Sequence, residues 1–244
     1  MDHPPEHPVA DPAGKNKAPM GPATPTLKLG GFTITGPPAV LAILFLLAAI
    51  VWLVVASRPS LGMLLSGGIW IGFMVFWSVT AQRGGGAKTE ESRPSRAAHQ
   101  NLTTVGLLLL FLPVPGLRWH LLPQTRWILP VGLGLEALAV LLHIWARRHL
   151  GKNWSSPVTI KPGHQLVRSG PYRLVRHPIY TALVCLAAGT AMVSGELHSL
   201  LGWVLFTFAY VRKLRLEERV LAETFAGEWG AYRKSSWALI PFVF

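Results

Sequence analysis

Residues 127–146 read WILPVGLGLEALAVLLHIWA, an apolar run in which Glu136 is the one charged residue. An α-helix rises about 1.5 Å per residue, so a helix of this length spans the roughly 30 Å of hydrocarbon in a bilayer. The run therefore predicts a membrane-spanning helix.

Five further apolar runs resemble it. They are Pro38–Ala56, Leu61–Ala81, Leu102–Leu112, Ile179–Ser194 and Leu197–Val211. The run Leu102–Leu112 is short because Pro113 follows it, so it needs Ala97 and Ala98 before it, or a kinked extension to Leu122, to cross. Backbone groups in lipid must bond to one another, and these runs are too long for barrel strands. The predicted fold is all-α, a polytopic integral membrane bundle of about six transmembrane helices.

The composition disfavours a soluble enzyme. Half of the 244 residues are hydrophobic and only 14% are charged, with a mean hydropathy of +0.38, whereas soluble domains carry about a quarter charged residues. The net charge of +12 would suit nucleic acid. The basic residues lie between the apolar runs, however, where they act as topology signals, and this argues against a nucleic-acid partner.

The distribution of these basic residues predicts the side on which each loop lies. With six spans and both termini inside, 20 lysines and arginines fall on inner segments, and the outer loops hold 3, Arg58, Arg118 and Arg126. This asymmetry satisfies the positive-inside rule. We expect both termini in the cytoplasm and the bundle in a bacterial inner membrane.

The chain divides into three predicted regions. Residues 1–37 are rich in proline and glycine without periodicity, which predicts a disordered leader and no cleavable signal peptide. Residues 38–146 hold the N-terminal transmembrane helices, and residues 147–244 hold the catalytic region. Cys185 is the single cysteine, so no internal disulfide or cysteine-based metal site can form. We predict no metal.

Two long inner segments flank the hairpin of the fifth and sixth runs. Residues 147–178 form a loop with breaks at Gly163, Gly170 and Pro178, so it cannot be one helix. Residues 212–244 first prolong the sixth helix, and Gly227 is its predicted end. Because long loops between spans are more often functional than not, we expect the two segments to meet and form the site, a cytosol-facing pocket.

The side chains of these segments suit a particular kind of ligand. Arginine or tyrosine binds a carboxylate, glutamate binds an ammonium group, and apolar or aromatic surface holds a flat base. S-adenosylmethionine carries all three groups, and so do other zwitterionic nucleotide-like ligands. On spacing alone, the favoured interpretation of Glu217 and Glu218 is a solvated helix face that pairs with neighbouring basic residues.

Three stretches carry a family resemblance, namely HQLVRSGPYRLVRHPIYTALV at residues 164–184, the pair Glu217-Glu218, and FAGEWGAYRKSSWALIPF at residues 225–242. In combination they resemble the isoprenylcysteine carboxyl methyltransferase family and its bacterial relatives. They are also similar to membrane phospholipid N-methyltransferases. The resemblance covers roughly residues 140–244.

This resemblance implies an integral membrane methyltransferase with S-adenosylmethionine bound between the inner loop and the C-terminal helix. The residues implied to line the cofactor pocket are His164, Leu166, Val167, Gly170, Tyr172, His177, Pro178, Tyr180, Glu217 and Glu218. We take Arg176, and after it Arg173, as the catalytic candidates that hold an acidic group of cofactor or substrate. The chain departs from the family at Lys213, where an arginine often precedes the glutamate pair.

The methyl acceptor stays open among a prenylcysteine carboxylate, a phospholipid amine and a small thiol, each lipophilic or small enough to arrive from the bilayer. Two other classes of function compete. A sterol-reductase-type enzyme using NADPH would need more spans and a longer cofactor loop. A transporter would leave the long inner loop unexplained.

Several motifs inside the apolar runs allow two interpretations. Gly132, Gly134 and Ala137 match a dinucleotide fingerprint, but in an apolar helix they favour close packing. Gly68 and Gly72 indicate a packing face, or a homodimer. His143 and His149 suit interfacial polar residues better than metal ligands. Glu136 is costly in lipid, so it must face protein or water, where a role at the substrate cavity is a fair hypothesis.

Overall fold

The computed structural model describes residues 26–29, 32–35, 58–80, 88–89, 91–123, 125–151, 159–160 and 165–242. The chain forms two compact units, Met1–Leu53 and Val54–Phe244. The first predicted span, Pro38–Ala56, lies outside the described residues. In the first unit, β1 (Thr26–Leu29) and β2 (Phe32–Thr35) pair antiparallel, with Thr26 opposite Thr35. This hairpin lies inside the predicted leader and was not predicted, although threonine and isoleucine favour strands.

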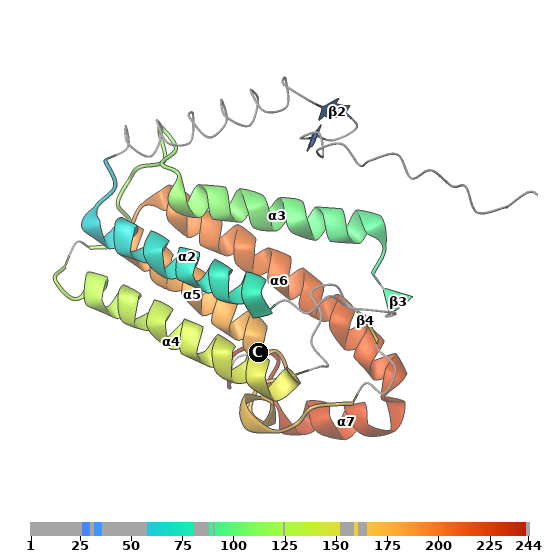
Figure 1. Cartoon of the computed structure of the whole chain (residues 1–244). Coiled ribbons are helices and arrows are strands. Elements are labelled where there is room, and N and C mark those ends of the chain that lie inside the picture. The colour runs from blue at the N-terminus through green and yellow to red at the C-terminus, as the bar shows by residue number, and fades with distance from the viewer. Residues whose placement is uncertain are drawn as a thin grey trace, which may run out of the picture. The chain divides into compact units, whose positions relative to one another are not determined.

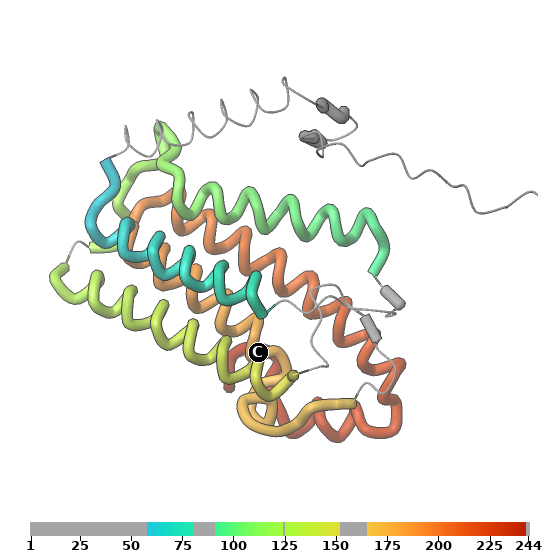
Figure 2. The backbone as a smooth tube through the Cα atoms, in the orientation of Figure 1, coloured from blue at the N-terminus to red at the C-terminus, as the bar shows by residue number. Residues whose placement is uncertain are grey.

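The second unit is a helical bundle (Figures 1 and 2), which confirms the predicted helical class. Its helices are α2 (Leu61–Thr80), α3 (Arg93–Phe111), α4 (Ile128–Leu150), α5 (Pro178–Ser194), α6 (Leu197–Thr224) and α7 (Ala226–Ser235). Helix α4 packs on α5, α5 on α6, and α6 on α3, while α2 contacts α4 and α5. Short strands β3 (Lys88–Thr89) and β4 (Thr159–Ile160) pair antiparallel.

The helix ends follow local chemistry. The Ser92 hydroxyl accepts a hydrogen bond from the Ser95 N–H and caps α3, which therefore includes Ala97 and Ala98 and ends before Pro113. The sixth helix continues past the apolar run, as predicted. The predicted end at Gly227 is wrong, because the helix stops at Thr224 and Gly227 lies within α7. The break at Phe225 turns the chain so that two aromatic residues of α7, Trp229 and Tyr232, become buried.

Glycines set the two closest helix crossings. A Cβ on Gly202 of α6 would lie 2.6 Å from the Leu110 N and 2.7 Å from the Gly106 O of α3. Likewise, a Cβ on Gly189 of α5 would lie 2.6 Å from the Gly132 O of α4. Backbone touches backbone at both places, so Gly132 serves packing, as favoured over the dinucleotide interpretation. A Cβ on Gly68, by contrast, would meet nothing within 4 Å, so this glycine serves no crossing among the described residues.

Hydrogen bonds join loops to one another at each of the two ends of the bundle. The β3–β4 pair joins the segment before α3 to the loop after α4 at one end. At the other end the Leu121 N–H donates to the Gly195 O at 2.9 Å, and Arg118 binds Glu196 through two contacts of 3.2 Å. His198 lies 2.9 Å from the same carboxylate. Burial acts to raise the pKa of Glu196, but Arg118 and His198 outweigh it and lower that pKa.

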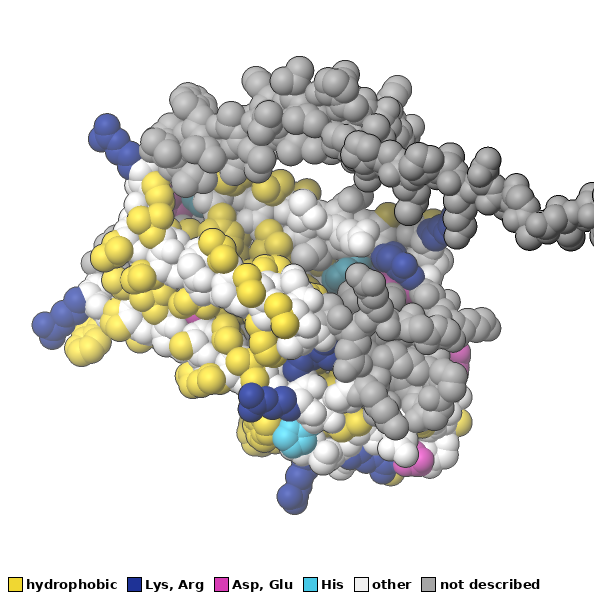
Figure 3. Space-filling model, viewed as in Figure 1, with side chains coloured by type: hydrophobic (Ala, Val, Ile, Leu, Met, Phe, Trp, Pro, Cys, Tyr) yellow, Lys and Arg dark blue, Asp and Glu magenta, His cyan; other side chains and the backbone are white. Residues whose placement is uncertain are grey.

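Two of the described helices, α2 and α4, are long and apolar enough to cross a membrane, and α5 is a shorter apolar helix. Hydrophobic side chains cover much of the face formed by α2 and α4, with basic residues towards its ends (Figure 3). Ile71 is 68% exposed and Leu138 is 65% exposed. An apolar surface of this extent suits lipid better than water.

Candidate active site

Backbone hydrogen bonds join the two inner segments, as the sequence predicts. The Arg176 N–H donates to the Trp237 O at 2.7 Å, and the Trp237 N–H donates to the Leu174 O at 3.0 Å. The His177 N–H then donates to the Ala238 O at 3.2 Å. Residues 236–239, which we call the tail strand, thus fix the backbone just before α5.

Helix α5 begins immediately after this contact. Pro178 occupies its first turn, where a missing N–H costs nothing, which confirms the predicted helix start. The Thr181 hydroxyl donates to the Leu239 O at 2.8 Å and holds the tail strand against the helix. His177 is buried at the N-cap, so its ring faces the protein and not solvent.

Arg176 links the loop, α6 and the tail. Its Nε donates to Glu218 Oε1 at 2.7 Å, and the two side chains are only 8% and 16% exposed. Its Nη1 also donates to the backbone carbonyls of Ser236 and Arg233, the latter at 3.3 Å. One guanidinium therefore satisfies acceptors from three segments, a geometry to which arginine is suited.

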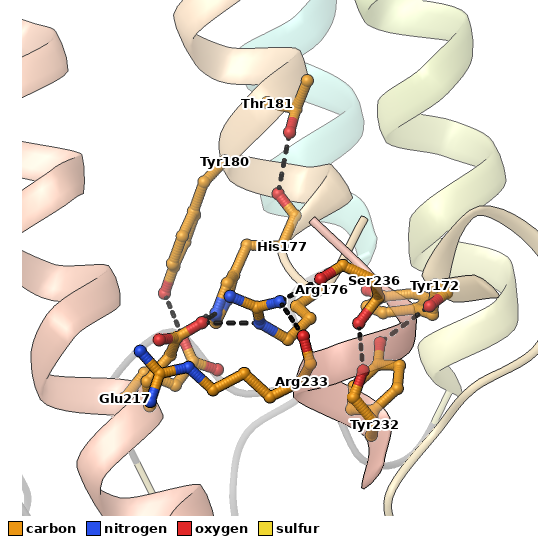
Figure 4. A network of polar contacts seen from close by, with 10 residues as sticks. Tyr172, Arg176, His177, Tyr180, Thr181, Glu217, Tyr232, Arg233 and Ser236 are labelled. Carbon is orange, nitrogen blue, oxygen red and sulfur yellow. Dashed lines mark hydrogen bonds and ion pairs between the residues drawn. The ribbon is translucent and has the colours of Figure 1, made fainter. Parts of the chain in front are cut away.

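Tyr180 and His177 bring the second carboxylate into the same network (Figure 4). The Tyr180 hydroxyl donates to Glu217 Oε2 at 2.7 Å. The Tyr180 and His177 rings stack with centroids 5.5 Å apart and planes 2° from parallel. His177 lies between the carboxylates, with Nδ1 3.7 Å from Glu217 and Nε2 3.5 Å from Glu218.

Burial and neighbouring charges shift the pKa values of Glu218 and of the nearby Lys213. Burial acts to raise the pKa of Glu218, but hydrogen bonds and charge from His177 and Arg176 outweigh it and lower that pKa to about 2. Burial lowers the pKa of Lys213, against the opposing effect of Glu217. The Lys213 ammonium lies 5.9 Å from the centre of the Tyr180 ring. Glu218 is thus a fixed anion, whereas Glu217 is 31% exposed and accessible to a ligand.

Helix α7 contacts the loop through hydrogen bonds and an ion pair. The Tyr232 hydroxyl of α7 donates to the Tyr172 carbonyl at 2.7 Å, and the Ser236 hydroxyl donates to the Tyr232 carbonyl at 2.6 Å. Arg168 pairs with Glu228 and lies 5.8 Å from the centre of the Tyr232 ring. Burial raises the pKa of Tyr232 to about 12, so this phenol stays a hydrogen-bond donor.

A pocket of about 630 Å³ lies between the end of α4 and residues 165–169 of the loop. It is lined by His149, Leu150, Gly151, Gln165, Leu166, Val167, Arg168 and Ser169. Gly170, with φ +58°, follows the lining and begins the 3₁₀ turn η2 (Gly170–Arg173), which leads to Tyr172. The left-handed φ explains why a glycine stands here.

The structure divides the predicted site residues into groups. Arg176, His177, Tyr180, Glu217 and Glu218 form the polar network. Leu166 and Val167 line the pocket, and Gly170, Tyr172 and Pro178 shape the backbone between them. Arg173 is exposed and makes no contact with this network. His164 lies outside the described residues.

Sequence reasoning missed the contributions of Tyr232, Ser236 and His149. The first two lie in the aromatic-rich stretch that carried the resemblance, and the spacing of Trp229 and Tyr232 could have indicated a buried helix face. His149 carried no such signal, because only the fold brings it to residues 165–169.

The arrangement suits a cationic ligand with an apolar base. One accessible carboxylate lies beside stacked aromatic faces, which together attract positive charge. Among the residues that the structure describes, no group of three His, Cys, Asp or Glu side chains could hold a metal ion.

Comparisons with known proteins agree with this geometry. Residues 132–223 match the model of the isoprenylcysteine carboxyl methyltransferase (ICMT) family. Protein-S-isoprenylcysteine O-methyltransferase of Schizosaccharomyces pombe is 32% identical over 118 residues, which cover 46% of this chain and 48% of that protein. Protein-S-isoprenylcysteine O-methyltransferase B of Arabidopsis thaliana is 26% identical over 132 residues, covering 53% and 64% respectively.

A third relative, uncharacterized protein YpbQ of Bacillus subtilis, is 32% identical over 63 residues, covering 25% of this chain and 36% of that protein. The chain thus covers less than two thirds of the length of each of these relatives. The matched segment contains α5, most of α6 and every residue of the polar network that lies before the tail. Residues 132–223 are thus similar to the isoprenylcysteine carboxyl methyltransferase family, and the resemblance predicted from the sequence is confirmed.

Proposed function

We propose that this chain is an integral membrane enzyme that transfers a methyl group from S-adenosylmethionine to a lipophilic acceptor. The observation that carries the proposal is the network in which Arg176 and His177 meet Glu217 and Glu218 between the inner loop and α6. The family match covers this segment, and the accessible carboxylate, the Tyr180 ring and the pocket at the end of α4 correspond to the parts of that cofactor.

The residues present fit S-adenosylmethionine group by group. Glu217 Oε1 makes no hydrogen bond with another described residue, so it is available to an ammonium group or to ribose hydroxyls. The ring of Tyr180, which is only partly buried, suits a sulfonium cation. The pocket lined by Leu166 and Val167 suits an adenine ring.

When bound, S-adenosylmethionine supplies a methyl group activated by its positive sulfur. The protein's task is then mainly alignment and exclusion of water. Arg176 holds Glu218 in one orientation, and Glu218 with Glu217 positions His177. An acceptor that is already ionised, such as a carboxylate or thiolate, requires no base, whereas Glu217 would take the proton of an amine acceptor.

We further propose the six-span topology, with both termini on the cytoplasmic side of a bacterial inner membrane. Exposed Trp127 and Trp145 stand 18 residues apart on α4, about 27 Å along a helix. Tryptophans at this separation are typical of the two interfaces of a membrane. The β3–β4 pair joins two loops that are both predicted to lie on the inner side. The contact of Leu121 with Gly195 joins two loops that are both predicted to lie on the outer side.

The acceptor class follows from the relatives. Two of them are named for methylation of protein S-isoprenylcysteine, so a prenylated cysteine carboxylate is the first acceptor to test. A phospholipid amine and a lipophilic thiol are the alternatives. All three reach the site from the bilayer, which agrees with the apolar surface of α2 and α4.

Calorimetric titration of the detergent-solubilised protein with S-adenosylhomocysteine tests the cofactor. We expect micromolar binding that weakens at least about tenfold in Glu217→Gln, because a charge-assisted hydrogen bond is lost. Glu223→Gln, an exposed glutamate further along α6, is the matched control and should bind as the native protein does. A folded protein that binds no S-adenosylhomocysteine would overturn the proposal. Transfer of radiolabelled methyl to each acceptor then identifies the substrate.

A further inference from the structure

His149, which none of the predicted roles includes, forms one wall of the 630 Å³ pocket at the end of α4. Its Nδ1 lies 3.0 Å from the Trp145 carbonyl, one turn back along the helix. A carbonyl can only accept, so Nδ1 must carry the hydrogen. In the neutral ring Nε2 is then an acceptor with its lone pair unused by this contact.

The position of Nε2 is fixed by Gly170. A Cβ on Gly170 would lie 2.5 Å from Nε2, so the edge of the imidazole rests directly on the glycine backbone. The ring of Trp145 packs against His149 from the other direction, with centroids 5.8 Å apart. The imidazole edge that bears the acceptor atom therefore lies against Gly170, next to the residues that line the pocket.

Residues 165–168 also line the pocket, and their backbone groups are available to a ligand as far as the described residues go. The backbone N–H and C=O groups of residues 165–168 make no hydrogen bond with another described residue. Leu166 and Val167 add apolar side chains to the same segment. Arg168, which also lines the pocket, is engaged by Glu228. Apolar walls, a backbone edge and one side-chain acceptor suit a flat heteroaromatic ring that bears an amino group.

We propose that His149 recognises the adenine of the cofactor by accepting a hydrogen bond from its exocyclic amine at Nε2. The inference rests on the proposed function, because it assumes that an adenosyl ligand occupies this pocket. His149 would then determine specificity for the adenine base. The polar network of Arg176, His177, Tyr180, Glu217 and Glu218 would bind the part of the cofactor that carries the methyl group.

The test compares S-adenosylhomocysteine with S-inosylhomocysteine, in which the exocyclic amine is replaced by a carbonyl oxygen. Calorimetric titration of the full-length, detergent-solubilised protein gives the ratio of the two dissociation constants. The native protein should prefer the adenosyl ligand at least about tenfold. In His149→Leu, which keeps the packing on Gly170, this preference should fall about three- to tenfold, the effect of one hydrogen bond.

Two further variants separate recognition from packing. His149→Gln retains a side-chain acceptor and should recover most of the preference. His120→Leu removes a histidine at the opposite end of the bundle and should leave both affinities unchanged. An unchanged ratio in His149→Leu, whether or not both affinities drop together, would overturn the proposal. If the native protein binds neither ligand, the proposed function itself fails, and this outcome is distinct from a ratio that does not respond to His149.

Discussion

At the scale of the residue, the site depends on one buried ion pair. Arg176 and Glu218 are both largely buried, so removing one partner leaves an uncompensated charge. We expect Arg176→Gln to reduce the free energy of unfolding by on the order of 3 kcal/mol and to weaken binding of S-adenosylhomocysteine. Denaturant titration of the detergent-solubilised protein measures the first effect and calorimetry the second.

The companion variants decide how Arg176 acts. Arg173→Gln changes an exposed arginine outside the network, so its unfolding free energy should stay within about 0.5 kcal/mol of the native value. The double variant Arg176→Gln with Glu218→Gln should recover part of the lost stability, because no charge is then left unpaired. Equal losses in the two single arginine variants would contradict this account.

Glu218 also predicts a pH dependence. Its pKa in the folded protein is about 2, below its ordinary value of 4.5. A lowered carboxylate pKa stabilises the fold fully above pH 4.5, and this contribution is lost as the pH falls towards 2. We expect the thermal midpoint of the native protein to exceed that of Glu218→Gln most above about pH 5 and the gap to narrow below pH 4.5.

Glu223→Gln, at an exposed position, is the control for this titration. Its thermal midpoint should equal that of the native protein at every pH. A difference between native protein and Glu218→Gln that is as large at pH 3 as at pH 6 would exclude the lowered pKa as its cause.

Arg176, His177 and Tyr180 could be predicted because they cluster around chain breaks in a short stretch, whereas Glu217 and Glu218 were predicted from the family resemblance. Glu217 was ambiguous between a solvated face and a site, since spacing along one helix does not show what packs against it. The hydrogen bond from the Tyr180 hydroxyl shows that Glu217 faces α5, and its role in a site stays a prediction. The sequence placed both Arg173 and Arg176 in the site, with Arg176 first. Which of the two side chains points into the protein depends on the η2 turn and on the tail strand, and neither can be read from the sequence.

At the scale of the element, glycines determine how closely the helices approach. Gly202 meets the α3 backbone, which cannot move aside as a flexible side chain would. We expect Gly202→Ala to lower the unfolding free energy by about 1–3 kcal/mol, the usual effect of overpacking. Gly134→Ala is the matched control on α4, where a Cβ would meet nothing within 4 Å, and it should be neutral or slightly stabilising.

Glu136 ties three helices together. Its Oε1 accepts hydrogen bonds of 2.7 Å from Ser66 of α2 and from Thr190 of α5. A glutamine can accept the same two bonds, so Glu136→Gln should keep stability within about 1 kcal/mol. Glu136→Leu leaves the buried Ser66 hydroxyl without its acceptor, while Thr190 keeps the Leu186 carbonyl, and the change should cost about 1–3 kcal/mol. Loss of methyl transfer in Glu136→Gln at unchanged stability would instead support the predicted role at the substrate cavity.

Helix positions followed from hydropathy, whereas helix partners did not. The ends of α4 and α5 lie within a few residues of the predicted runs. The pairing of α3 with α6, which brings together segments distant in sequence, has no signature in periodicity alone. It depends on the close approach of Gly106 and Gly202 and on side-chain hydrogen bonds such as Ser199 to the Leu110 carbonyl, which only the fold brings together. The break at Phe225 was missed because glycine is the stronger local signal for a helix end.

At the scale of the whole molecule, the proposed topology assigns each end of the bundle to one side of the membrane. In a Cys185→Ser background, Arg126→Cys should react with a membrane-impermeant maleimide in intact cells. Lys234→Cys, on the end that carries α7, should react only after permeabilisation. Both positions are exposed, so protection reports the membrane and not burial. Labelling of Lys234→Cys in intact cells would contradict the topology.

The tail strand carries a consequence for biosynthesis. The carbonyls of residues 236–238 hold the backbone and guanidinium of Arg176 and the backbone of His177. A ribosome that has inserted all the helices up to α6 has not yet made these groups, and the loop lacks its anchor until they emerge. On the proposed function, the bundle therefore enters the bilayer in an inert form, and its chemistry starts only after residues 236–239 have left the ribosome.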